Sequence, residues 1–309
     1  MKTVDGFKDS NIHFKWDPNL SPIEYVDSGS DLVIQIPDSS TKQIKETFQT
    51  SDLAGIDNQL FDGAVGPIFV EGAEPGDALK ITINKIETGN WAWTAALHDF
   101  GLLSNEFQDE LVIWKIKDGL AVSKRKGFFD GMTFKTNPFL GIIGTAPASG
   151  TFTMIPPQRF GGNMDNRLNR ESSVLYLPVN VKGALVSFAD PHALQGDGEV
   201  CGTAMETSCN CHVKIEVIKG MKINYPRVNA TDNTSGNFVN TMGIGPDILE
   251  AAKDAVREMI GILSDQGYKR VEAYMLCSIM GNLRISEIVD IPNYVVTMSM
   301  PIMTRPKIS

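Results

Sequence analysis

Short runs in which apolar and polar residues alternate recur along most of this chain, separated by turns rich in Gly and Pro. Leu79, Ile81 and Ile83 alternate with polar residues just after Pro75-Gly76, a dipeptide typical of a type II turn. Alternation with a period of two indicates a strand, because successive side chains of a strand point to opposite faces. Further strand-length runs occupy residues 31–36, 111–116, 174–179, 184–188 and 209–217. Residues 1–220 are therefore predicted to form a β-rich part.

The C-terminal part, residues 221–309, adds one long helix. Apolar residues from Ile248 to Leu263 recur every three or four positions, Pro246 suits a first helical position, and Gly267 suits a helix end. This pattern predicts a helix over about 246–266, and we expect strands over 271–280, 283–289 and 294–299. The predicted fold class is mainly β with an α+β C-terminal part, the two parts packed as one unit.

The charge and composition of the chain restrict its partners and its compartment. The 309 residues carry a formal net charge of -9, and no basic stripe offsets it. This argues against nucleic acid and against an anionic membrane surface as partners. The sequence shows neither an apolar leader segment nor an apolar run long enough to span a membrane. Four cysteines do not make a disulfide framework, so we expect a reducing, cytoplasmic setting.

The densest group of reactive side chains follows the strand predicted at 184–188. Its polar members are Asp190, His192, Gln195, Asp197 and Glu199. A histidine together with carboxylates is the donor set that a borderline divalent metal such as Zn²⁺ prefers. Asp197 and Glu199 would project to the same side of an extended segment, since they lie two positions apart. A polar loop with a proline turn is the alternative interpretation of these residues alone.

A second polar group follows the pair Gly161-Gly162. Asn163 and Asp165 offer an amide and a carboxylate two positions apart, next to glycines that allow the backbone to approach a ligand. An ordinary Asx turn explains the same residues, and the pattern alone does not decide between the two.

The cysteines do not indicate a zinc site or a nucleophile. Cys209 and Cys211 alternate in step with Val213, so both thiols are predicted to face the core of a strand, and their spacing is shorter than that of structural zinc sites. Cys201 has no basic partner close to it in the sequence.

Three motifs, in this order, resemble hallmarks of the acetamidase/formamidase family. They are Gly66-Pro67-Ile68-Phe69-Val70-Glu71-Gly72-Ala73-Glu74-Pro75-Gly76-Asp77, Gly161-Gly162-Asn163-Met164-Asp165 and Asp190-Pro191-His192-Ala193-Leu194-Gln195-Gly196-Asp197-Gly198-Glu199-Val200-Cys201-Gly202-Thr203-Ala204-Met205-Glu206. The resemblance implies hydrolysis of small linear amides to a carboxylate and ammonia, with a divalent metal that is often zinc. It also implies β-sandwich and barrel-like subdomains and assembly into a homo-oligomer.

Within this resemblance, Asp165, His192, Asp197 and Glu199 fall on the polar motif positions of the family. Our hypothesis makes Asp165 and His192 metal ligands and Glu199 the residue that shuttles a proton. Asp197 is predicted to be a further ligand or to orient the site, and the catalytic roles of Asp197 and Glu199 are exchangeable at this stage.

Other residues are predicted to contact the substrate. Asn163 and Gln195 are expected to donate hydrogen bonds to its carbonyl oxygen. His98 lies where many relatives carry Pro-Gly-Phe-Gly in place of His98-Asp99-Phe100-Gly101, so it is expected to shape the pocket together with Trp91 and Trp93.

Two alternatives remain open from the sequence. A non-catalytic β-sandwich binding protein would use the same polar cluster to hold a structural Ca²⁺, whose ligands would all be oxygen atoms. A relative that acts on lactams or larger amides would differ only in the volume of its pocket.

Overall fold

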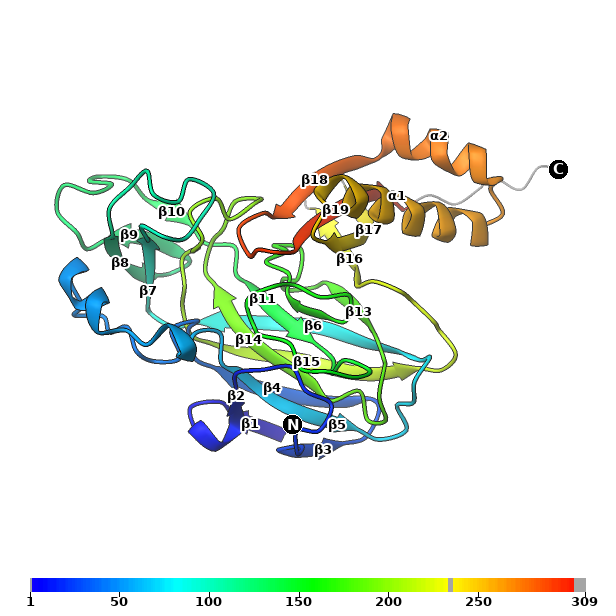
Figure 1. Ribbon diagram of the computed structural model, residues 1–309, viewed down its shortest axis with the longest axis horizontal. Coiled ribbons are helices and arrows are strands. Elements are labelled where there is room, and N and C mark those ends of the chain that lie inside the picture. The colour runs from blue at the N-terminus through cyan, green and yellow to red at the C-terminus, as the bar shows by residue number, and fades with distance from the viewer. Residues whose placement is uncertain (1, 233–235, 303–309) are drawn as a thin grey trace.

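The computed structural model describes residues 2–232 and 236–302, and its architecture is dominated by three β-sheets (Figure 1). The largest has nine strands, which in pairing order are β1 (Lys2–Asp5), β4 (Ser30–Ile36), β15 (Cys209–Ile218), β6 (Ala78–Thr88), β13 (Val174–Pro178), β16 (Arg227–Asp232), β17 (Gly236–Gly245), β19 (Tyr294–Pro301) and β18 (Asn282–Glu287). The predicted fold class, mainly β with an α+β C-terminal part, is confirmed.

A second sheet covers one face of the first. Its strands in pairing order are β12 (Gly161–Asn163), β11 (Phe139–Gly144), β14 (Val186–His192), β5 (Ala64–Val70) and β2 (Ile12–His13), and β3 (Glu24–Val26) also pairs with β5. One continuous apolar core joins the two sheets, with Ile34 and Ile81 from the first meeting Ile143 and Phe188 from the second. The two sheets therefore form a sandwich.

A smaller sheet projects from this sandwich (Figure 1). Its strands in pairing order are β10 (Phe134–Lys135), β9 (Leu120–Ser123), β8 (Glu110–Lys117) and β7 (Trp91–Ala96). Three short 3-10 helices lie in the loops, namely η1 (Asp9–Asn11), η2 (Thr50–Gly55) and η3 (Asn58–Leu60). A small apolar cluster ties η2 to this sheet, because Leu53 packs with Trp93 and Leu111.

The alternation read from the sequence corresponds to the burial of the strands. Along β15, Cys209, Cys211, Val213 and Ile215 are all buried in the core of the sandwich. His212 points the other way and contacts Glu87 at 3.1 Å. The interpretation of the two thiols as core residues is confirmed.

The C-terminal part contains two helices, α1 (Ile248–Asp265) and α2 (Arg270–Met280). The helix α1 begins after the predicted start because Asp247 is its N-cap and accepts hydrogen bonds from the N–H groups of Leu249 and Glu250. The strand predicted over 271–280 is wrong, since this segment is α2. A short apolar run fits a buried strand and a helix equally well, and here only positions 273 and 277, one helical turn apart, are buried.

The main sheet continues across residue 220, because β16 pairs with β13 with Val174 opposite Asn229. No helix within residues 2–232 and 236–302 is both long and apolar enough to cross a membrane.

Candidate active site

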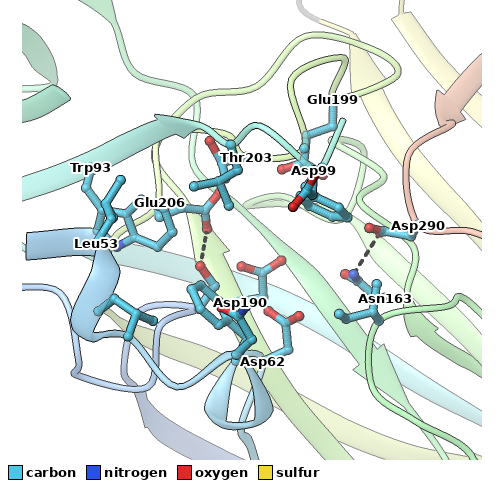
Figure 2. Close-up of a pocket in the computed structure, with 18 of the residues that line it drawn as sticks. Leu53, Asp62, Trp93, Asp99, Asn163, Asp190, Glu199, Thr203, Glu206 and Asp290 are labelled. Carbon is cyan, nitrogen blue, oxygen red and sulfur yellow. Dashed lines mark hydrogen bonds between the residues drawn. The ribbon is translucent and has the colours of Figure 1, made fainter. Parts of the chain in front are cut away.

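The main cavity has a volume of about 740 Å³ and lies between the sandwich and the loops that lead to the small sheet. Figure 2 shows Trp93 and Leu53 on one side of it and Asn163 and Asp290 on the other. The polar motif residues of the sequence that line it include Asp165, Asp190, His192, Glu199 and Glu206. The carboxyl side chains that line it are Asp62, Asp99, Asp109, Asp165, Asp190, Glu199, Glu206 and Asp290.

Strand β14 brings the first two functional groups to this floor. Asp190 and His192 are two positions apart in the strand, and their side chains meet, since Nε2 of His192 lies 2.9 Å from Oδ1 of Asp190. Both are buried, with exposed fractions of 4% and 1%. The backbone φ of Asp190 is 55°, and Asp165 and Glu199 also have positive φ values, of 39° and 45°. Such backbone is costly for residues other than glycine, and the floor acids are held there by the surrounding fold.

His192 is the centre of the polar network. Its Nδ1 lies 2.8 Å from Oε1 of Gln195, whose Nε2 donates to the carbonyl oxygen of Asp165 at 2.8 Å. Because that backbone carbonyl requires a donor, the amide of Gln195 is oriented with its oxygen toward the ring, and Nδ1 carries the hydrogen. The other ring atom, Nε2, lies 2.9 Å from Oδ1 of Asp190 and 3.0 Å from Oε2 of Glu206.

This geometry changes the predicted role of Gln195. Its oxygen faces His192 and its nitrogen faces Asp165, so both ends of the amide are engaged behind the floor. Gln195 is not one of the described residues that line the cavity. It holds the histidine and the loop of Asp165 in place and is not positioned to contact a substrate.

Glu206 joins the network from the segment after the polar cluster. Its Oε2 accepts a hydrogen bond from the hydroxyl of Ser39 at 2.8 Å, and its Oε1 accepts one from the N–H of Ala204 at 2.6 Å. These fixed donors orient the carboxylate toward His192.

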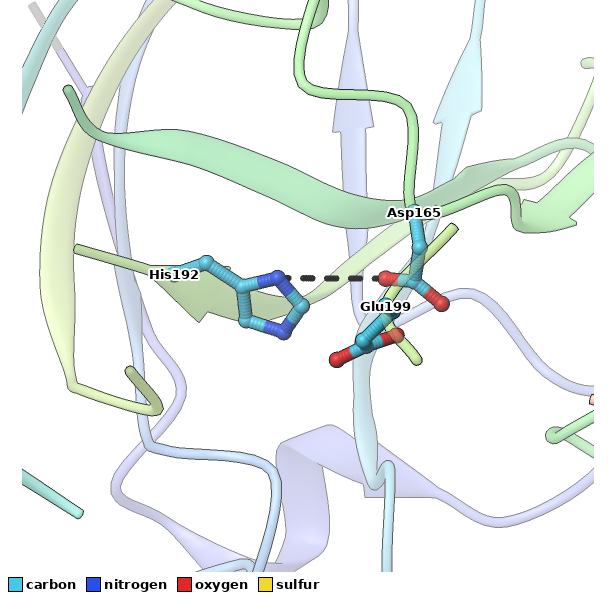
Figure 3. A group of neighbouring side chains, drawn as sticks. All are labelled: Asp165, His192 and Glu199. Carbon is cyan, nitrogen blue, oxygen red and sulfur yellow. Dashed lines mark ion pairs between the residues drawn. The ribbon is translucent and has the colours of Figure 1, made fainter. Parts of the chain in front are cut away.

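Asp165 and Glu199 also lie beside the imidazole (Figure 3). Oδ1 of Asp165 lies 3.9 Å from Nδ1 of His192 and, although buried, has no hydrogen-bond partner among the described residues. A buried carboxylate oxygen without a partner is costly unless a cation or a proton meets it. The structure thus brings together three residues that the sequence singled out.

Gly141 on β11 makes room for two of these acids. A Cβ atom at this position would collide with Oδ1 of Asp165 and with Oδ2 of Asp190, so the two carboxylates meet over the glycine backbone. A larger side chain at this position of the strand would displace these carboxylates.

Asn163 lies at the other wall, next to a second acidic group. Its Nδ2 donates to Oδ2 of Asp290 at 2.8 Å, whereas its Oδ1 is buried without a partner among the described residues. Asp290 follows β18, whose last residue, Glu287, is also buried. Asn163 therefore presents an unpaired acceptor to the cavity.

Asp197 is not part of this network, contrary to the prediction that it ligates metal or acts in catalysis. Its carboxylate is exposed and pairs with Nε of Arg167 at 2.8 Å and with Nη1 of Arg284 at 3.7 Å. The segment is not extended at this point, because Gly198 has a φ of 92° and Glu199 a φ of 45°. The two carboxylates consequently point in different directions, and only Glu199 reaches the cavity.

His98 lies at the mouth of the cavity, not on its floor. It is half-exposed, and its Nδ1 donates to the carbonyl oxygen of Phe107 at 2.9 Å. Of the two tryptophans, Trp93 lines the cavity and Trp91 does not.

The accumulation of buried acids perturbs the proton affinity of the site. Burial, with added repulsion from neighbouring carboxylates, raises the pKa well above the ordinary carboxyl value at Asp62, Asp190, Glu199 and Asp290. Burial likewise raises the pKa of Glu287 to about 8. Burial by itself would lower the pKa of His192, but Asp190 and Glu206 outweigh it and raise that pKa well above its usual range. Bound protons or a cation must therefore neutralise the negative charge of the floor.

Two groups of residues have the donor types and spacing of a metal site. They are Asp165, His192 and Glu199, and Asp190, His192 and Glu206, and in each group the candidate ligand atoms lie within 4.8 Å of one another. Since Nδ1 of His192 is engaged with Gln195, its Nε2 is the atom that can accept a metal, which favours the second group.

A comparison with protein-family models matches the acetamidase/formamidase family over residues 3–154 and 148–304. The chain belongs to this family. It is 27% identical to a formamidase of Methylophilus methylotrophus, with 95% of this chain and 89% of that protein covered. It also resembles the crystal structure of a protein described as a predicted acetamidase/formamidase from Thermoanaerobacter tengcongensis, with a TM-score of 0.88, 30% identity and coverage of 97% and 95%. An acetamidase structure from Bacillus halodurans has a TM-score of 0.87 at 28% identity, with 96% of each chain covered. The family read from the three motifs is confirmed.

The sequence analysis assigned no role to several acidic residues on or near the floor. Glu206 belongs to the third motif and Asp190 opens it, so both were available as candidates there. Asp62, Glu287 and Asp290 lie outside the motifs, and no local pattern distinguishes them from ordinary loop acids.

Proposed function

We propose that this chain hydrolyses small linear amides to a carboxylate and ammonia on the floor of the cavity. Membership of the acetamidase/formamidase family supports this reaction, as do relatives named formamidase and acetamidase. The observation that carries the proposal is that two residues lining the cavity, Asp165 and Asn163, each have a buried side-chain oxygen without a hydrogen-bond partner in the described part of the chain. The first suits a cation, and the second suits the N–H donors of an amide.

We propose that the floor holds a divalent metal, which we assign as Zn²⁺, on His192, Asp190 and Glu206, with Asp165 as a further ligand. The nitrogen donor favours Zn²⁺ over Ca²⁺, which prefers oxygen ligands alone. The unpartnered oxygen of Asp165 and the excess of buried carboxylates fit this assignment. When bound, such a metal supplies Lewis acidity toward the amide carbonyl and makes water more acidic.

Glu199 is proposed to move the proton in this reaction. Its buried carboxyl has a pKa well above the ordinary value because of desolvation and of the nearby Asp165. Such a group can take up the proton that the attacking water loses and deliver it to the leaving nitrogen. Asn163 orients the amide by accepting a hydrogen bond from one of its N–H groups. This role differs from the prediction from the sequence, in which Asn163 donates a hydrogen bond to the carbonyl oxygen.

The test is ammonia release from formamide, acetamide, propionamide and a lactam, with protein as purified, after chelation, and after Zn²⁺ is restored. Activity that disappears on chelation and returns when the metal is restored supports a metalloamidase. Ammonia release that persists after chelation contradicts it, provided that elemental analysis shows the protein to be free of metal. Glu199→Gln should lower kcat by about 100-fold or more while metal content is unchanged. The exposed Glu171→Gln serves as the matched control.

We also propose that the protein is a homo-oligomer. The outer face of α2 exposes Val271, Tyr274, Met275 and Ile279, the last with an exposed fraction of 75%. These positions form one apolar stripe without charge, which suits an interface that pairs a surface with itself. Ile279→Glu should lower the mass of the protein measured by light scattering. Leu120→Glu, on the small sheet, is the control and should leave this mass unchanged. An unchanged mass for Ile279→Glu would contradict an interface on α2.

A reducing, cytoplasmic compartment is proposed for the same chain. All four cysteines are free, and Cys209 and Cys211 are buried side by side on one strand face without forming a disulfide.

A further inference from the structure

The cavity is far larger than the small amides named for the family relatives require. Its volume of about 740 Å³ lies in the range of pockets that take drug-sized ligands, about 300–1,000 Å³. Acetamide, whose acyl group is a single methyl, would occupy only the polar floor. The space above the floor is therefore available to a larger acyl group.

The wall on one side of that space is apolar. Leu53, Ile56 and Phe61 line it from the segment of η2 and η3, and Trp93 and Leu97 line it from β7 and the loop that follows. These side chains belong to one cluster and are packed on each other, so the wall is built into the fold. Nε1 of Trp93 donates to Oδ1 of Asp38 at 3.1 Å, which satisfies the single polar atom of the indole outside the cavity.

The acidic side chains around the same space outnumber the basic ones. Eight carboxyl side chains line the cavity, and no Lys or Arg is found among the described residues that line it. Asp99 and Asp109 extend this charge to the mouth. An acyl group that carries its own carboxylate would meet repulsion from Asp99 and Asp109 at the mouth and would find no Lys or Arg side chain to pair with among the described residues that line the cavity.

We propose that the preferred substrates are primary amides of uncharged, apolar acyl groups several carbons long, and that amides with an anionic acyl group are rejected. The inference rests on the proposed amidase function and adds the substrate class. The amide lies on the floor between His192 and Asn163, and the acyl chain lies along Leu53, Ile56 and Trp93. The apolar wall supplies the binding free energy of the chain, and the acidic lining supplies the selection against negative charge.

The test compares kcat/KM for acetamide, pentanamide and succinamate, which has about the length of pentanamide but ends in a carboxylate. Each added methylene in an apolar pocket is worth about tenfold or more, so pentanamide should exceed acetamide by at least about tenfold. Succinamate should fall below pentanamide by at least the same factor. The measurement uses the full chain with Zn²⁺ present.

Two variants of the wall test the assignment of residues. Leu53→Asn and Ile56→Asn keep side-chain size but introduce polarity, and each should lower the ratio of pentanamide to acetamide turnover by about tenfold. Leu120→Asn, at an exposed position on β9, is the matched control and should leave the ratio unchanged. The ratio is informative because general damage to the fold affects both substrates alike.

The outcomes separate this inference from the proposed function. Turnover of acetamide at a rate equal to or above that of pentanamide overturns the inference and leaves the amidase function standing. Succinamate turned over as well as pentanamide overturns the selection by charge. No ammonia from any amide, with metal bound, overturns the amidase function and this inference with it.

Discussion

Nδ1 of His192 donates to Oε1 of Gln195 across 2.8 Å, and the same amide donates from Nε2 to the backbone of Asp165. One buried side chain therefore fixes both the ring of the histidine and the loop that carries an acid of the floor. It also determines that Nε2 is the ring atom which faces Asp190 and Glu206.

Loss of this amide should weaken metal binding. Gln195→Met keeps the length of the side chain and removes both hydrogen bonds, so we expect affinity for Zn²⁺ to fall by about 10–100-fold. Competition with a chromogenic chelator measures this, with the exposed Gln59→Met as control. Equal affinity in the two variants would show that the ring of His192 is held by its other contacts.

Gly141→Ala should disturb the floor although the acidic residues themselves are not substituted. The added methyl group would push apart the carboxylates of Asp165 and Asp190, at a cost of about 1–3 kcal/mol for overpacking. We expect lower metal content and lower activity. Gly196→Ala is the control, because a Cβ atom there meets nothing within 4 Å. Metal content that stays at the wild-type value in Gly141→Ala would contradict the proposed closeness of the two acids.

Asp197→Asn should leave binding of the proposed metal unchanged. Its pairs with Arg167 and Arg284 are near the surface, where ion pairs contribute about 0–1 kcal/mol. Urea unfolding should show a loss within this range, and elemental analysis should show unchanged metal. A large loss of metal would return Asp197 to the ligand set that the sequence suggested.

His13 should make the stability of the fold depend on pH. Burial lowers its pKa from 6.5 to about 4, and Nε2 lies 2.8 Å from Oγ of Ser187. Between these two pH values the unfolded chain holds a proton on His13 that the folded chain does not. Stability is therefore complete above pH 6.5 and falls as the pH drops to about 4, by about 3 kcal/mol at 1.36 kcal/mol per pH unit.

Comparison with His13→Gln isolates this contribution from that of the buried acids. The difference in free energy of unfolding between wild type and variant should shift by about 3 kcal/mol between pH 7 and pH 4. A difference that does not change with pH would mean that His13 is not buried as a neutral ring.

The sequence predicted the fold class and part of the site because both leave local patterns. Alternation placed Cys209 and Cys211 in the core, and the third motif contained His192 and Glu199, which the structure brings to one floor. The same local reasoning misplaced the segment 271–280, since an apolar run of that length has no distinctive period, and it grouped Asp197 with Glu199 by assuming extended backbone.

The sequence by itself determined the strand pattern, the long helix α1, the family motifs and the identity of the one histidine on the floor. Only the tertiary structure decided which acids surround that histidine. Asp62, Glu206 and Asp290 come from separate parts of the chain, and pairing between distant strands brings them together. Backbone with positive φ turns Glu199 into the cavity and leaves Asp197 to two arginines outside it. The physical reason is that strand pairing and burial are non-local, so the direction of a side chain depends on neighbours that the local sequence does not contain.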